Sequence, residues 1–328
     1  MNIDRVHRNG IKNFIKIVLL IFLEIVIPRP AFAQVAGDDF NTYILKAASI
    51  IQKNYLDLGY ANQAYTHNIT YGNDQIKAEK PPQTMCVAAM AELIAIAINE
   101  YAKETGDTSV FTYLPARNFT SMSATDLRSY IWVDHRLKSY GTADALILFG
   151  MGKRVPFSEL KAGSFINLNR TTNQGHAVMF VSFIDIKGTE LPAYSKEVAG
   201  FKYFSAQGEK LSAGHGAGFG FRYAIFGPVE HCPVLPGKFR DCGIILSSDQ
   251  KMLNTGYMLN PTKWDKSVRD SNLNVKIQQM YNDAQAKGKN FKGIESYVDR
   301  LDFEGKVSVD NVMTLNPAYL HEKTTDDE

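Results

Sequence analysis

The stretch Thr84-Met-Cys-Val-Ala-Ala-Met-Ala-Glu-Leu-Ile-Ala-Ile-Ala-Ile-Asn-Glu-Tyr-Ala102 predicts the helix on which the fold is built. Thr84 carries the hydroxyl that a helix N-cap uses, and Gly106 ends the segment. Apolar residues cover nearly every side of this helix, so we expect it to be buried all round. Its many alanines allow neighbouring strands to approach it closely.

The chain after this helix changes from helical spacing of apolar residues to alternation with a period of two. We expect an antiparallel meander, because loops rich in turn residues separate the predicted strands. These strands are 164–168, 176–184, 201–206, 221–226 and 243–247. Further helices are expected at 38–56, 124–133, 142–149 and 263–286. Helices followed by an antiparallel sheet predict an α+β fold.

The first 33 residues have the parts of a secretion signal. Basic residues precede the apolar run Ile17–Leu23, and Ala31-Phe-Ala33 has the small-x-small pattern that signal peptidase cuts. Glu24 and two prolines interrupt the run, well short of the roughly 20 apolar residues that span a bilayer. We therefore expect a secreted or periplasmic protein whose mature chain starts at Gln34.

The charge balance argues against nucleic acid and anionic membranes as partners. The whole chain has 36 basic and 34 acidic residues, for a net charge of +2. The predicted signal holds five basic and two acidic residues, which leaves 31 basic and 32 acidic residues and a net charge of −1. Because nucleic-acid binding relies on an excess of basic side chains, we expect no nucleic-acid partner.

Three cysteines remain in the mature chain. Cys232 and Cys242 are ten residues apart and flank a turn-rich segment, so we expect them to close a local disulfide in an oxidising compartment. This pairing leaves Cys86 as a free thiol. A free thiol in an exported protein needs a reason, because it is open to oxidation.

Cys86 lies in the first turn of the predicted buried helix. The unpaired amides and the positive end of the helix dipole favour the nucleophilic thiolate there, so we expect a lowered pKa for this thiol. The alternative is an inert core cysteine. His176 starts a strand that is apolar on both faces, and an imidazole at a strand end beside a thiol at a helix start makes a Cys/His pair. Its alternative role is to close a loop by hydrogen bonding.

A Cys/His pair needs a third group that orients the imidazole. Alternation along residues 201–207 places Tyr203, Ser205 and Gln207 on one face of a strand. We prefer Gln207, because its amide oxygen can accept a hydrogen bond from the imidazole without adding charge. Ser205 remains the alternative.

Three segments resemble, in their order and spacing, the papain-like cell-wall hydrolases of the CHAP and NlpC type. They are Thr84-Met-Cys86 at a helix start, Leu160-Lys-Ala-Gly-Ser-Phe-Ile166, and Gly175-His-Ala-Val-Met-Phe-Val181. The resemblance covers residues 83–227. It departs from the family in the second segment, where alanine replaces proline and serine replaces aspartate. The resemblance implies a papain-like core and a cysteine peptidase or amidase acting on peptidoglycan peptides.

By this resemblance Cys86 matches the nucleophile, His176 the base and Gln207 the third catalytic residue. The predicted divisions are a signal peptide, an N-terminal helical extension, a papain-like catalytic domain and a C-terminal helical extension. They span residues 1–33, 34–82, 83–250 and 251–328.

Two other kinds of function are compatible with these residues. One is a catalytically inactive module that binds the wall or a protein, and the other is a thiol acyl- or glutamyl-transferase. No motif indicates a cofactor. A metal site near His215 and His231 is disfavoured, because the sequence has no HExxH or paired CxxC and a Cys232–Cys242 disulfide would remove two ligands.

Overall fold

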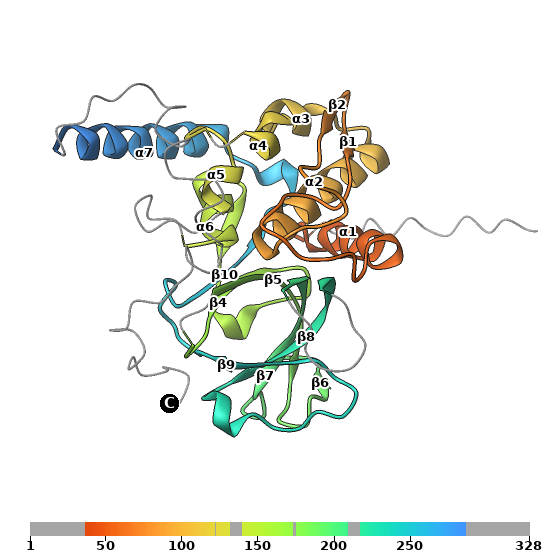
Figure 1. Cartoon of the computed structure of the whole chain (residues 1–328). Coiled ribbons are helices and arrows are strands. Elements are labelled where there is room, and N and C mark those ends of the chain that lie inside the picture. Colours follow the sequence, from red (N-terminus) through yellow and green to blue (C-terminus); the bar gives the residue numbers. More distant parts are fainter. Residues whose placement is uncertain (1–36, 122, 132–139, 173–174, 209–216, 287–328) are drawn as a thin grey trace, which may run out of the picture. The chain divides into compact units, whose positions relative to one another are not determined.

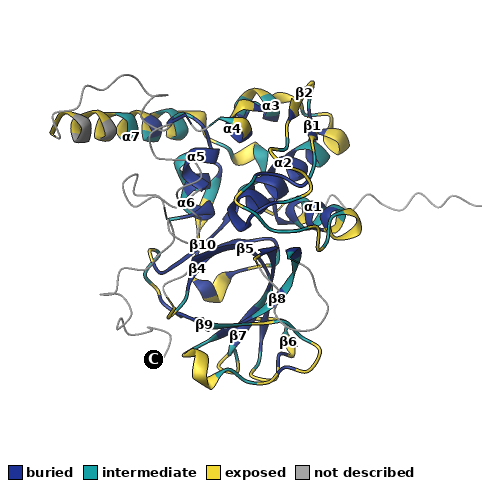
Figure 2. Cartoon of the chain, viewed as in Figure 1, coloured by how far each residue is buried: buried dark blue, intermediate teal, exposed yellow. Residues whose placement is uncertain are grey.

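The predicted buried helix is α2, Cys86–Thr105, in the computed structural model (Figure 1). Met85, with an extended backbone, precedes it as the N-cap, so the prediction of Thr84 as the cap is wrong. At the other end Gly106 adopts the left-handed conformation, with φ 75°, which glycine reaches without a steric penalty. All residues from Cys86 to Ile98 are buried, as expected (Figure 2).

The structure describes residues 37–121, 123–131, 140–172, 175–208 and 217–286. The predicted secretion signal, His215 and the chain after residue 286 lie outside these ranges. Within them, no helix is both long and apolar enough to cross a membrane.

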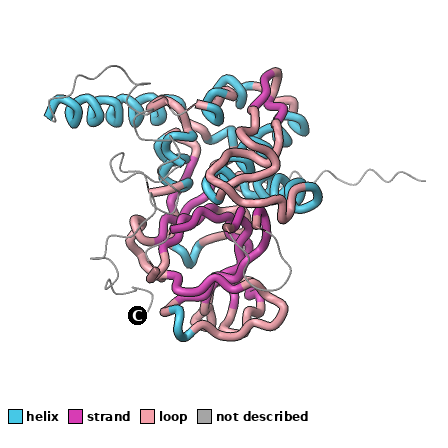
Figure 3. Tube along the Cα trace, in the orientation of Figure 1, coloured by secondary structure: helices cyan, strands magenta, loops and turns pink. Residues whose placement is uncertain are grey.

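Most of the other helices and a small hairpin lie with α2 on one side of the large sheet (Figures 1 and 3). α1, Asn41–Asn54, packs along α2 and contacts it through the rings of Phe40, Tyr43 and Tyr101. The remaining elements of this layer are β1 (Ile69–Tyr71), β2 (Asp74–Ile76), α3 (Ser109–Tyr113), α4 (Arg117–Thr120), α5 (Arg128–Ile131), α6 (Thr142–Leu148) and α7 (Lys266–Ala286).

The sheet has eight strands, seven of them in the order β3-β10-β4-β5-β7-β8-β9, with β6 paired to β5. Neighbours from β4 to β8 are antiparallel, which confirms the predicted meander for its first four strands. The fifth was predicted at 243–247 as an antiparallel strand, and this is wrong, because β9 runs parallel to β8. The strands are β3 (Gly152–Arg154), β4 (Phe165–Asn169), β5 (Gly175–Ile184), β6 (Glu190–Leu191), β7 (Gly200–Gln207), β8 (Gly218–Phe226), β9 (Arg240–Ile244) and β10 (Leu253–Met258). The predicted α+β class is therefore confirmed.

The sheet curls until the end of β9 meets the end of β4. Arg170 and Ile244 form a bridge, and the Thr171 amide donates to the Gly243 carbonyl at 2.8 Å. Strands β4, β5, β7, β8 and β9 thus enclose a barrel. Its interior is an aromatic core that includes Phe157, Phe180 and Phe201.

α2 covers the outer face of the barrel at β5 and β7. Alternate residues of β5 and β7, such as Ala177 and Ala206, join the core around α2. The residues between them along each strand point into the barrel, since side chains alternate between faces. Over residues 176–180 of β5 and 203–207 of β7, a side chain therefore faces either the helical core or the barrel interior.

The predicted division of the chain differs from the structure at its C-terminal boundary. Residues after 250 do not begin a helical extension, because β10 lies inside the sheet and pairs with both β3 and β4. In the described part beyond β10, the α-helix is α7, which agrees with the helix predicted at 263–286. The N-terminal segment is also part of the main core, through the packing of α1 on α2.

Candidate active site

Cys86 is the first residue of α2 and its side chain is fully buried. The hydroxyl of Tyr60 contacts its sulfur at 3.9 Å. The ring of Tyr60 also lies beside Gly208, the residue that follows β7. Cys86 is therefore near the end of the barrel at which β7 finishes. The first-turn amides of α2 give this position a partial positive charge.

His176 lies at the same end of the barrel, as the second residue of β5, opposite Leu168 of β4. It alternates with Ala177, so its side chain is on the inner face. The ring packs edge-on to Tyr203 at 5.7 Å between centroids. The imidazole Nε2 is buried and has no hydrogen-bond partner among the described residues.

Gln207, the last residue of β7, shares the inner face with Tyr203, as the alternation predicted. The Tyr203 hydroxyl lies 3.5 Å from the Gln207 amide. Ser205 instead donates its hydroxyl to the Ala177 carbonyl at 2.6 Å, which ties β7 to β5. The structure thus brings Gln207, rather than Ser205, to the polar side chains around His176.

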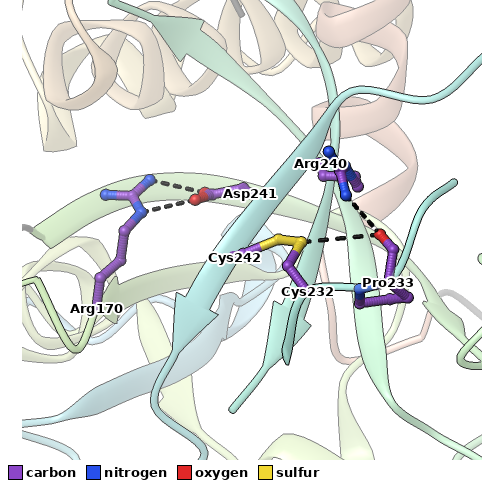
Figure 4. Close-up of a disulfide and its surroundings, with 6 residues drawn as sticks. All are labelled: Arg170, Cys232, Pro233, Arg240, Asp241 and Cys242. Carbon is purple, nitrogen blue, oxygen red and sulfur yellow. Dashed lines mark hydrogen bonds and ion pairs between the residues drawn. A yellow bond between two sulfur atoms is a disulfide. The ribbon is translucent and has the colours of Figure 1, made fainter. Parts of the chain in front are cut away.

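An ion pair that the sequence did not indicate completes this cluster. Arg170, just after β4, donates from two nitrogens to the two carboxylate oxygens of Asp241 on β9, both at 2.7 Å (Figure 4). The two side chains are only 15% and 10% exposed. Tyr203 donates its hydroxyl to the same carboxylate at 2.6 Å. Asp241, Tyr203 and Gln207 therefore form a continuous polar chain that ends beside His176.

The predicted disulfide between Cys232 and Cys242 is present (Figure 4). Cys86 is the cysteine outside this disulfide. Cys242 follows Asp241 directly, so the disulfide anchors the strand that carries this carboxylate into the barrel. With both sulfurs paired, Cys232 and Cys242 are not ligands for a metal ion. Within the described ranges, no group of three His, Cys, Asp or Glu side chains is placed to hold one.

Burial and the neighbouring Arg170 lower the pKa of His176 to about 3. The imidazole is therefore neutral at neutral pH, which is the form that can accept a proton. Burial alone would lower the pKa of the Arg170 guanidinium. The Asp241 carboxylate outweighs this effect, so the pKa is raised. Cys86 contributes electrostatically to the same rise, so its sulfur is within electrostatic range of Arg170.

The charge of Arg170 beside His176 is balanced by Asp241, because the two side chains are paired through two hydrogen bonds. Sequence reasoning missed Arg170 and Asp241 because neither belongs to a local motif. Only the alternation along β4 places Arg170 on the inner face, after Ile166 and Leu168.

The chain matches no family model, no curated protein and no solved structure.

The burial of His176 makes a prediction about stability. The folded chain holds the imidazole neutral, with a pKa of about 3, whereas an unfolded chain takes up a proton below about 6.5. The contribution of His176 is fully present above pH 6.5 and is lost between pH 6.5 and 3. Between pH 7 and 5 the free energy of unfolding should fall by about 2 kcal/mol from this group alone.

Urea unfolding of the wild type and of His176→Gln at both pH values measures this loss. The variant should lack the His176 contribution and therefore depend less steeply on pH. An equal pH dependence in the two proteins would show that His176 is not held neutral in the folded state.

Proposed function

We propose that this protein is an exported cysteine hydrolase that cleaves amide bonds in peptidoglycan peptides. Cys86 is the nucleophile, His176 the general base and Gln207 the group that orients the imidazole. The observation that carries the proposal is the position of these residues at one end of the barrel. A free thiol at a helix start lies there with a neutral imidazole and an amide. The sequence resemblance to cell-wall hydrolases supports the choice of substrate.

The reaction proceeds in two halves. The Cys86 thiol gives its proton to His176 as the sulfur attacks the amide carbon, and the imidazolium then protonates the departing amine as the C–N bond breaks. A water molecule next gives a proton to His176 and attacks the thioester carbon. The C–S bond breaks and the proton returns to the sulfur. Backbone N–H groups in the first turn of α2 are suited to stabilise the oxyanion in both halves.

Access to the sulfur requires movement in the ligand-free structure. Cys86 exposes no surface, and Tyr60 contacts its sulfur. A peptide carbonyl must displace the Tyr60 hydroxyl before the sulfur can reach the carbon. Substrate binding is therefore expected to shift the segment that carries Tyr60.

A non-catalytic module that binds the cell wall is the second candidate function, and the same burial favours it. Reactive cysteines are usually partly accessible, whereas buried structural cysteines are inert. The two candidates differ in the fate of the wall polymer, because a binding module leaves the peptides intact.

Incubation of residues 34–328 with purified peptidoglycan sacculi separates the candidates. The hydrolase should release soluble fragments whose masses show the addition of one water at a peptide amide bond. When an amine is added, the hydrolase should still transfer the acyl group mainly to water. A transferase would instead give products in which the acyl group is joined to the amine. Sedimentation of the protein with sacculi, without release of any fragment, would support the binding module and contradict the proposal.

A further inference from the structure

The charge on Asp241 decides the direction of the hydrogen bonds around it. Burial raises the pKa of this carboxyl group, but Arg170 outweighs that effect and the pKa is lowered. The carboxylate is therefore ionised at neutral pH and can only accept hydrogen bonds. Its short contact of 2.6 Å with Tyr203 is thus one in which the tyrosine hydroxyl donates.

The single hydroxyl proton of Tyr203 is then no longer available for Gln207. The amide atom that lies 3.5 Å from the hydroxyl is Oε1. In that orientation Oε1 of Gln207 faces the lone pairs of the Tyr203 hydroxyl oxygen, and no proton lies between the two atoms. The two ends of a glutamine amide have nearly the same shape, so hydrogen bonding decides between them. A turned amide places Nε2 toward Tyr203, where it donates to the phenol oxygen.

Turning the amide also gives a hydrogen-bond partner to the end of Gln207 that lies near His176. Gln207 Nε2 and His176 Nε2 are both buried, and neither has a hydrogen-bond partner in the described part of the chain. Gln207 is close enough to His176 to offset part of the lowering of its pKa by burial and Arg170. With the amide turned, Oε1 replaces the unpartnered nitrogen and can accept a hydrogen bond from the imidazole.

We propose that Asp241 and Tyr203 are positioning residues, which fix the amide of Gln207 so that its oxygen faces His176. Arg170 keeps Asp241 in place through its two hydrogen bonds. The neutral imidazole then carries its proton on Nε2, and Nδ1 is the basic nitrogen. One net hydrogen bond favours this tautomer by roughly tenfold. The role of these residues in catalysis rests on the proposed function. The hydrogen bonds between them and the tautomer of His176 do not depend on it.

The tautomer of His176 is measurable in the ligand-free protein. Histidine labelled with ¹⁵N in the ring gives distinct nitrogen signals for the two tautomers, and His176→Gln identifies the signal of this residue. The wild type should show one dominant tautomer with the proton on Nε2. Tyr203→Phe should reduce the preference about tenfold, to a mixture of both forms. Tyr71→Phe is the matched control, because it also removes a buried hydroxyl, which is bonded to the Leu114 carbonyl at 2.8 Å.

A second variant tests the same hydrogen-bond chain if Tyr203→Phe does not fold. Gln207→Met removes the amide at similar volume and should give the same mixture, because the chain is cut one step later. An unchanged tautomer in either folded variant would overturn the proposal, and so would an equal change in Tyr71→Phe. Since no substrate is used, a failed hydrolysis assay would count against the proposed function and leave this result untouched.

Discussion

Hydrolysis of peptidoglycan peptides should fall by about a thousandfold or more when Cys86 is replaced by alanine. His176→Gln should cause a loss of similar size, because the thiol then lacks the base that takes its proton. The double variant should be no slower than either single variant, since residues that act as one unit are strongly non-additive. The measurement is the initial rate of fragment release from sacculi, read by mass spectrometry.

Ser205→Ala is the matched control for these variants. It removes a buried hydroxyl two residues from Gln207, but one that bonds to the Ala177 carbonyl rather than to the site. Its rate should stay close to the wild type, while Gln207→Met should be slowed by a smaller factor than Cys86→Ala. Release of fragments by Cys86→Ala at the wild-type rate would remove Cys86 from the mechanism.

Ending the protein at Gln250 should prevent folding altogether. This truncation deletes β10, whose backbone pairs with β3 on one side and β4 on the other. It also deletes the fully buried Leu253 and Met258, which belong to the barrel core and the helical core respectively. Loss of each such side chain costs about 2–5 kcal/mol, against a total stability of about 5–15 kcal/mol for a typical protein.

A protein ending at Ala286 is the matched comparison, because it keeps every described element. Circular dichroism and urea unfolding should show a cooperative transition for residues 34–286 and none for 34–250. A cooperative transition with the same midpoint in both proteins would mean that β10 is dispensable.

The sequence predicted the parts of the fold in which local pattern and burial agree. The buried helix is a long apolar segment, and the strands from β4 to β8 alternate with a period of two. β10 was missed because Leu-Asn-Thr-Gly-Tyr-Met has a glycine and polar residues in place of a β-branched run. Its buried Asn254 is satisfied by Asp144 from α6, a partner that no local pattern reveals.

Some residues of the candidate site could be predicted from the sequence and others could not. Cys86 and His176 could be selected by their positions at a helix start and a strand start, and Gln207 by alternation. Arg170 and Asp241 could not, because they are 71 residues apart in the chain. They meet only when the barrel closes at the bridge between Arg170 and Ile244. Closure depends on the twist of the whole sheet, which is a property of the assembled strands.

The placement of β10 has a consequence for the order in which the chain folds. It is the last strand among the described residues, yet it pairs with strands that are synthesised much earlier, through Gly256 opposite both Phe165 and Arg154. Pairings between distant residues are slow to form, because a long loop must close first. If the chain is exported as proposed, a precursor that enters an export channel from its N-terminus cannot complete its sheet until residue 258 is free. The late strand is expected to keep the precursor unfolded, and so competent for threading, until most of it has been translated.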